Sequence, residues 1–246
     1  MSGWTTEELM ACVIARAIHD GETVSVGTLS PIPATGAYLA QALHAPRARL
    51  LVHGARDYPF RSGTKEFFDF AQRGRIDLFF LSGAQIDAHG NINLHAIGPY
   101  ERPAVRLPGG AGSGMLYYMA RRVILFKMEH DARGLVEQVD FVTSAAEAPQ
   151  GVLRRGGPVL LVTPLCLFRY DAGAQRLRLA SVHPGVTLDE VRARTGWVIP
   201  PAELEDAEVT PPPSEAELVA LRGPVRGRVA AIYPEFAARV WGEVAR

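Results

Sequence analysis

Apolar residues recur along this chain in two spacings, one typical of helices and one typical of buried strands. Thr5-Thr6-Glu7-Glu8 has the form of a capping box, and apolar residues at helical spacing follow it from Met10 to Ala17. Short apolar runs predict strands over residues 22–27, 49–53, 76–81, 123–128 and 159–163. Further helices are predicted over residues 36–43, after a proline-rich loop, and over residues 66–73. Strands that alternate with helices predict an α/β fold, with a mostly parallel central sheet flanked by helices.

The pattern changes toward the end of the chain. Residues 168–171 and 176–179 lie on either side of Asp171-Ala-Gly173, and this arrangement predicts an antiparallel hairpin. Residues 199–214 are rich in proline and acidic residues, so we interpret them as an extended surface segment that leads to a C-terminal helical tail. The length of 246 residues and the lack of an internal repeat favour a single domain over residues 1–246.

Composition excludes several classes of protein. An apolar fraction of 48% with 21% charged residues is typical of a globular chain. Lys and Arg number 26, as do Asp and Glu, so there is no basic excess of the kind that nucleic-acid binding requires. No apolar run approaches the roughly 20 residues that span a bilayer, and MSGWTTEEL lacks the features of a signal peptide. We therefore expect a cytoplasmic protein that does not bind membranes.

Two segments have the composition of ligand-binding loops. Residues 108–114 hold four glycines and precede a predicted helix, an arrangement whose converging N–H groups bind anions or oxyanions. A flexible surface loop is the alternative. Residues 82–93 follow a buried strand and carry several polar side chains, which either contact a ligand or hydrogen-bond the loop to itself. Cys12 and Cys166 lack metal-ligand spacing, so no metal site is expected.

Several motifs in a fixed order resemble those of one family. They are Gly83-Ala-Gln-Ile-Asp87 with Gly90-Asn-Ile-Asn93, then Ile97-Gly98, Arg106 and the glycine-rich loop, then Met128-Glu-His130, Val139-Asp-Phe-Val-Thr-Ser144 and His183-Pro-Gly-Val-Thr187. Together they resemble the β subunit of class I CoA-transferases, and in particular that of the glutaconate CoA-transferase type. The similarity runs from the first helix to about Trp197.

The resemblance implies a CoA-transferase superfamily fold and a homologous α subunit as partner, in an α2β2 heterotetramer with the active site between subunits. It implies acyl-CoA substrates, with coenzyme A as part of the substrate and no permanently bound cofactor. In the family a glutamate of the β subunit attacks the thioester. Two loops supply the oxyanion and CoA contacts, and the matching residues here are Gly83, Ala84, Gln85, Gly109, Gly110, Ala111 and Gly112.

The chain departs from the family where that glutamate should stand. The matching segment reads Leu50-Leu-Val-His53-Gly-Ala55, with histidine in place of glutamate, and Ala111 occupies a glycine position of the family's G-x-G-G loop. The resemblance extends to steroid ring-opening CoA hydrolases and to a methylglutaconyl-CoA decarboxylase, which also lack the glutamate. Imidazole is a good general base near neutral pH, so His53 either activates water or orients a carboxylate, or it is a spectator.

We therefore expect an enzyme that hydrolyses, decarboxylates or cleaves a carbon–carbon bond of an acyl-CoA. Two alternatives stay open: a genuine transferase that moves CoA between carboxylic acids, and a non-catalytic partner subunit. Arg56 and Arg61 follow His53 and either hold a substrate carboxylate or are simply solvated. Tyr117 follows the glycine-rich loop and either lines the acyl pocket or packs in the core.

Overall fold

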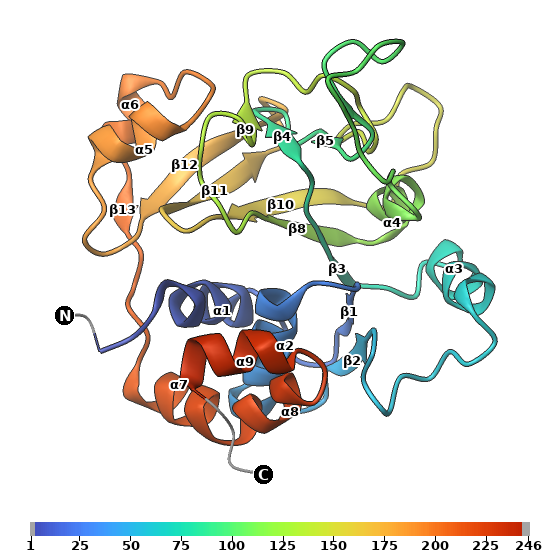
Figure 1. The fold of residues 1–246 in the computed structure, drawn as a ribbon, viewed down its shortest axis with the longest axis vertical. Helices are drawn as coiled ribbons and strands as arrows, with labels where there is room; N and C mark the ends of the chain where they lie inside the picture. The colour runs from blue at the N-terminus through green and yellow to red at the C-terminus, as the bar shows by residue number, and fades with distance from the viewer. Residues whose placement is uncertain (1–2, 243–246) are drawn as a thin grey trace. The chain divides into compact units, whose positions relative to one another are not determined.

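A computed structural model describes residues 3–242 of the 246-residue chain. Its residues divide into two compact units. The first is built from residues up to 67, residues 76–80 and the chain from 212 onward, and the second from residues 68–75 and 81–211. Each unit contains strands and helices of its own (Figure 1).

The first unit has three parallel strands and two groups of helices. Strand β1 (Thr23–Val26) pairs in parallel with β2 (Arg49–Val52) and with β3 (Leu78–Leu81). Helix α2 (Pro31–Leu43) contacts β1 and β2, and α1 (Thr6–Arg16) packs on α2. The C-terminal helices, drawn in red in Figure 1, lie beside α2. They are α7 (Glu215–Ala220), η1 (Leu221–Val225), α8 (Arg226–Ala230) and α9 (Pro234–Trp241).

Polar contacts explain how α1 begins and what holds it against the C-terminal helices. Thr5 and Glu8 form both hydrogen bonds of the predicted capping box, at 2.9 and 3.2 Å. Arg16 pairs with Glu217 of α7 at 2.7 Å, and the guanidinium of Arg222 lies 2.8 Å from the buried carboxylate of Glu8. The N-terminal and C-terminal parts of the chain therefore form one helical layer of this unit.

The prediction of a loop before residue 36 is wrong. Helix α2 begins at Pro31, and Pro33 lies within its first turn. The first N–H groups of a helix have no partner inside it, so proline costs nothing there and its fixed φ suits the helix.

The second unit contains a mixed sheet. Strand β8 (Arg122–Phe126) pairs in parallel with β10 (Gly157–Val162), which pairs antiparallel with β11 (Cys166–Asp171). The hairpin of β11 and β12 (Arg176–Val182) confirms the prediction of an antiparallel element. Short strands add two small sheets: β4 (Gln85–Asp87), β5 (Ile92–Asn93) and β9 (Leu135–Val136) form one, and β6 (Ala96–Ile97) and β7 (Val105–Arg106) form the other. The helices of this unit include α4 (Ser113–Met119) and α5 (Leu188–Arg194), and α3 (Thr64–Gln72) has residues in both units.

The predicted α/β fold is confirmed, because parallel pairs predominate and helices accompany the strands. The segment 199–214 is only partly extended, since Pro201–Glu205 form α6, a short helix with proline at its first position. Glu208–Val209 (β13) then pair with β12. The predicted helical tail is present as far as Trp241, and residues 243–246, like Met1 and Ser2, lie outside the described residues.

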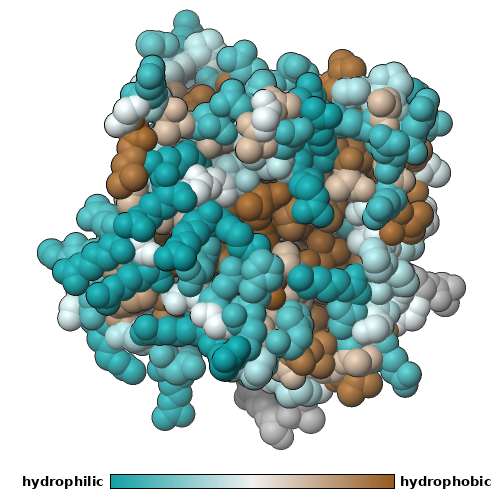
Figure 2. Space-filling model, turned by 180° about the vertical axis from the view of Figure 1, so that it is seen from behind, coloured by the Kyte–Doolittle hydropathy of each residue, from teal (hydrophilic) through white to brown (hydrophobic). Residues whose placement is uncertain are grey.

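Buried apolar side chains of the strands and of α1 and α2 form most of the core. On the face shown in Figure 2, polar side chains cover much of the surface and apolar ones reach it in several places. Among residues 3–242, no helix is both long and apolar enough to cross a membrane.

Candidate active site

His53 stands immediately after β2, and its N–H donates to the carbonyl of Val26 at 3.0 Å. Its half-buried ring lies between aromatic side chains, with the Phe67 ring edge-on at 5.1 Å and the Tyr58 ring at 4.4 Å. The Tyr58 hydroxyl is 2.6 Å from Nε2 of His53. Burial lowers the pKa of His53, so the imidazole is neutral near pH 7. A neutral imidazole at the end of a parallel strand can accept a proton.

Arg56 and Arg61 lie in the loop after His53, and both are exposed. Within the described part of the chain neither forms an ion pair. They are therefore available to an anionic ligand, and as exposed side chains they are also well solvated.

The polar loop before and within β4 and β5 is hydrogen-bonded to itself. The side chain of Gln85 in β4 accepts from Asn93 in β5 at 2.8 Å and donates to Asp140 at 3.1 Å. Asp87 accepts hydrogen bonds from the N–H groups of His89 and Asn91, both at 3.0 Å. The polar side chains of this candidate loop therefore fix its shape. Contacts to a ligand would come from its backbone groups and from neighbouring residues.

The side chain of a lysine holds the backbone of Gly83 and Ala84 in place. The ammonium of Lys127, just after β8, donates to the carbonyls of both residues at 3.1 Å. Burial lowers the pKa of Lys127, and nearby Asp131 and Glu129 oppose this shift. A side chain on Gly83 would lie 2.3 Å from Ile92, so only glycine fits this position.

The glycine-rich loop makes a tight turn before α4. Gly109 has φ +95°, and Ala111 has φ +46°, a left-handed conformation that is costly for alanine. Within residues 3–242, no acceptor is found for the backbone N–H groups of Gly110, Ala111 and Gly112. An oxyanion site is built from free N–H donors of this kind that converge on one point.

One short segment joins the two candidate loops. The N–H of Ala84 donates to the carbonyl of Asn93, and the N–H of Gly109 donates to the carbonyl of Leu94, both at 2.9 Å. His95 follows directly, and sequence reasoning missed it. Its only signal in the sequence is its place two residues after the Gly-Asn-Ile-Asn93 motif.

Tyr117 does not line a pocket. Its side chain is completely buried, and its hydroxyl donates to the carbonyl of Gly90 at 2.8 Å. The guanidinium of Arg154 lies over its ring at 4.8 Å. Tyr117 therefore packs in the core. It does not line an acyl pocket, because a ligand cannot reach a fully buried side chain.

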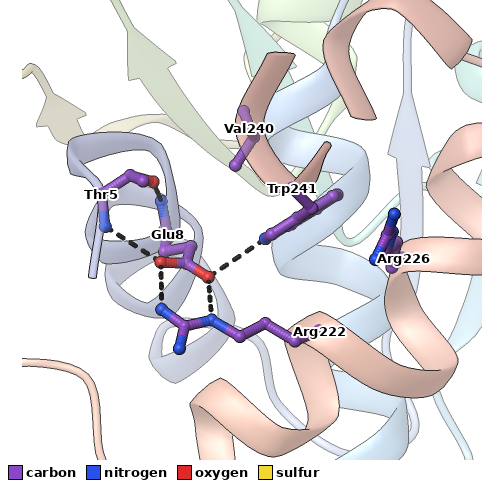
Figure 3. Close-up of a pocket in the computed structure, with 6 residues that line it drawn as sticks. All are labelled: Thr5, Glu8, Arg222, Arg226, Val240 and Trp241. Atoms are coloured by element: carbon purple, nitrogen blue, oxygen red, sulfur yellow. Dashed lines mark hydrogen bonds and ion pairs between the residues drawn. The ribbon is translucent and has the colours of Figure 1, made fainter. Parts of the chain in front are cut away.

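A pocket of about 260 Å³ in the first unit holds none of the predicted site residues. Figure 3 shows Glu8 at its centre, with Arg222 and the indole N–H of Trp241 pointing at the carboxylate. Burial alone would raise the pKa of Glu8, but these hydrogen bonds outweigh it and hold the pKa below its usual range. The acidic side chain is thus fully engaged in joining helices.

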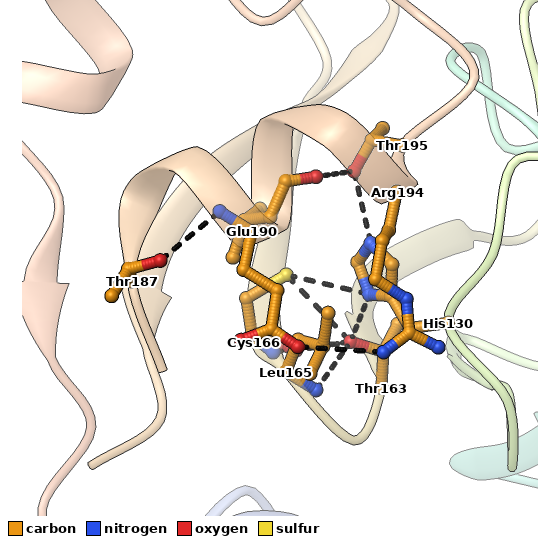
Figure 4. Close-up of polar contacts among 9 residues, drawn as sticks. His130, Thr163, Leu165, Cys166, Thr187, Glu190, Arg194 and Thr195 are labelled. Carbon is orange, nitrogen blue, oxygen red and sulfur yellow. Dashed lines mark hydrogen bonds and ion pairs between the residues drawn. The ribbon is translucent and has the colours of Figure 1, made fainter. Parts of the chain in front are cut away.

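A second polar cluster lies inside the second unit (Figure 4). His130 bonds Thr163 at 2.8 Å and Thr195 at 2.9 Å, and burial lowers its pKa to about 4. Cys166 is also buried, which raises the pKa of its thiol to about 12. These groups are inert and structural. No cluster of three or more His, Cys, Asp or Glu side chains suited to a metal ion is present among the described residues.

Residues 57–194 match the Coenzyme A transferase family, so the chain belongs to this family. It is 35% identical to the B subunit of the 3-oxoadipate CoA-transferase of Pseudomonas knackmussii, over 95% of this chain and 97% of that protein. It is 27% identical to the cholesterol ring-cleaving hydrolase IpdB subunit of Mycobacterium tuberculosis, over 89% and 93%.

Several solved structures share the fold. The decarboxylase AibA/AibB matches with a TM-score of 0.77 and 27% identity, over 97% of this chain and 99% of that one. Glutaconate coenzyme A-transferase of Acidaminococcus fermentans matches with a TM-score of 0.78 and 25% identity, over 99% of both chains. The predicted family and fold are thereby confirmed.

Proposed function

We propose that this chain is the β subunit of a heteromeric enzyme that hydrolyses, decarboxylates or cleaves a carbon–carbon bond of an acyl-CoA without a glutamyl-CoA intermediate. One observation carries the proposal: His53 occupies the end of β2, where the family's nucleophilic glutamate is expected. A carboxylate can form a stable covalent ester with CoA, whereas an imidazole cannot, so transfer by that route is closed.

His53 is proposed to act as a general base. Its pKa lies below the ordinary histidine value, so the ring is unprotonated at neutral pH, and Nδ1 has no hydrogen-bond partner among the described residues. General-base catalysis contributes roughly 10²–10⁴ in rate. Two relatives without transferase names, a ring-cleaving hydrolase and a decarboxylase, support chemistry of this kind on the same fold.

The two loops joined through Asn93 and Leu94 are proposed to receive the thioester. The unpaired N–H groups of Gly110, Ala111 and Gly112 suit the carbonyl oxygen as negative charge develops on it. Arg56 and Arg61 are proposed contacts for charged groups of the substrate. A homologous α subunit completes the enzyme, since the relatives are named as subunits of two-component proteins.

CoA transfer between carboxylic acids is a second candidate. The 35% identity to one subunit of a 3-oxoadipate CoA-transferase favours it. It requires a nucleophile other than the residue at the end of β2. Glu66 is the nearest glutamate after His53 in the chain, and it is exposed, with its carboxylate near the N–H of Ser62.

The test uses this chain purified with its partner subunit. The complex is incubated with a panel of acyl-CoAs, with and without an acceptor acid, while free thiol is measured and acyl products are identified by mass spectrometry. We expect turnover without the acceptor, and its loss by at least about 10²-fold in His53→Ala. The exposed residue His19 serves as a matched control, because His19→Ala should keep full activity. Strict dependence on the acceptor, with its CoA ester formed and no free thiol, would establish the transferase instead.

A further inference from the structure

The ring of His95 is held rigidly from three sides. Its backbone N–H donates to the side-chain oxygen of the buried residue Asn93 at 3.0 Å. Its Nδ1 lies 2.7 Å from the hydroxyl of Thr143. Its ring contacts Phe141, with ring centroids 4.8 Å apart and the ring planes tilted by 47°. A half-buried histidine held at its backbone, at one ring nitrogen and by a neighbouring ring has little freedom left, so the direction of Nε2 is determined.

The hydrogen bonds of Thr143 determine which nitrogen carries the proton. Its hydroxyl oxygen already accepts the N–H of Leu94 at 2.8 Å. Its own proton has no acceptor among the described residues except Nδ1 of His95. When the hydroxyl donates to Nδ1, the proton of neutral His95 resides on Nε2. His95 therefore presents an N–H donor at its outer edge.

That edge faces the glycine-rich loop. A Cβ atom built on Gly109 would lie 3.6 Å from Nε2 of His95, and it would meet nothing else within 4 Å. A Cβ on Gly110 would lie 3.8 Å from the neighbouring ring carbon of His95. The space beside Gly109 is thus open, and it is bounded by a side-chain donor that has no protein partner within residues 3–242.

We propose that Nε2–H of His95 binds the acyl oxygen of a CoA thioester in this space, beside the N–H groups of the glycine-rich loop. This inference rests on the proposed function, because it assigns His95 to the acyl-CoA site proposed at the glycine-rich loop. The chemistry that recognises the ligand is a hydrogen bond from a neutral donor to a carbonyl oxygen, which strengthens as that oxygen gains negative charge. His95 is therefore a catalytic residue in addition to His53, and Thr143 is its positioning residue.

The first test compares two substitutions of His95 in the complex with the partner subunit. His95→Leu removes the donor and should lower kcat for the best acyl-CoA of the panel by about 10²–10³, the usual loss for one oxyanion donor. His95→Gln places an amide N–H near the same point and should recover activity to within about tenfold of wild type. Equal losses in both variants, at unchanged thermal stability, would overturn the proposal. The exposed His19 is the control, since His19→Leu should leave kcat unchanged.

The second test does not depend on turnover. The complex is prepared with ¹⁵N-labelled histidine and examined by NMR. The signals of His95 are identified as those that are missing from the spectrum of His95→Gln. We expect a protonated Nε2 and an unprotonated Nδ1, and a shift of the Nε2 signal when the methylene ketone analogue of acetyl-CoA is added. Protonation on Nδ1, or an Nε2 signal that the analogue leaves in place, would overturn the proposal. If the wild-type complex turns over no acyl-CoA, the proposed function fails, and the NMR result still decides the role of His95.

Discussion

The hydroxyl of Tyr58 lies 2.6 Å from Nε2 of His53, in a pair whose two residues are only five positions apart. Burial raises the pKa of Tyr58 to about 12 and lowers that of His53. Both groups are therefore uncharged near pH 7. Once His53 gains a proton on Nδ1, its Nε2–H can donate to the phenol oxygen of Tyr58. The aromatic rings around the pair, among them Phe60 and Phe67, keep water from one side of it.

Tyr58→Phe should weaken His53 as a base without removing it. A hydrogen bond that a protonated imidazole donates is stronger than one that a neutral imidazole makes. Removing the Tyr58 hydroxyl therefore disfavours the protonated form of His53 and lowers its pKa further. We expect kcat to fall about tenfold with little change in KM, and the acidic limb of the pH–rate profile to move to lower pH. Steady-state kinetics of the two-subunit enzyme from pH 5 to 9 provides the measurement. An acidic limb that stays in place or moves upward would show that Tyr58 only packs against His53.

Ala111→Gly should stabilise the protein. The left-handed conformation at φ +46° destabilises alanine by roughly 1–2 kcal/mol. Glycine has no such strain, but it loses more conformational entropy on folding, which costs about 0.5–1 kcal/mol. We expect a net gain of about 0.5–1 kcal/mol in the free energy of unfolding, measured by urea titration. The exposed loop residue Ala104 is the matched control, because its φ is not positive and Ala104→Gly should destabilise the protein. Equal effects of both substitutions would contradict the strain at Ala111.

The sequence predicted the longer strands because most of them are short apolar runs that end up buried, as in Leu78–Leu81. It did not predict the shorter strands β4, β5, β6, β7, β9 and β13, which have no such run. It predicted the family and the position of His53 because those depend on motifs in a fixed order along the chain. It missed the contacts that give His53 and His95 their properties. Thr143 is 48 residues from His95 in the chain, and only the folded second unit brings them to 2.7 Å. Tyr117 failed as a candidate for the same reason, since its burial depends on the packing of distant segments.

Lys127→Met should destabilise the loop that carries Gly83. The substitution keeps the length and apolar stem of the side chain but leaves the carbonyls of Gly83 and Ala84 without their donor. Unsatisfied groups of this kind cost about 1–3 kcal/mol, which should appear in the free energy of unfolding. Lys65, the other lysine of the chain, is exposed, so Lys65→Met should change stability by less than about 0.5 kcal/mol. Hydrogen exchange at Ala84 and Gln85 should also speed up in the Lys127 variant alone.

Two buried histidines should make stability fall as the pH drops below 6.5. His130 is bonded to Thr163 and Thr195, and His183 is bonded to Thr210 and to the carbonyl of Thr163. Burial lowers the pKa of each to about 4. The unfolded chain binds their protons from about pH 6.5 downward, whereas the folded chain does not until about pH 4. Stability from this source is complete above pH 6.5, and about 3 kcal/mol per histidine is lost by pH 4.

Urea titrations between pH 7.5 and 4 test this dependence. His183→Gln keeps hydrogen-bonding capacity but cannot titrate, so its free energy of unfolding should start lower at pH 7.5 and decline less steeply between pH 6.5 and 4 than that of wild type. The exposed His19 provides the comparison, because His19→Gln should follow the wild-type curve in parallel. A His183→Gln curve as steep as wild type would mean that carboxylates, and not the buried histidines, govern the acid sensitivity of this fold. A flatter curve would show that the burial of His183 as a neutral group accounts for part of the acid sensitivity of this fold.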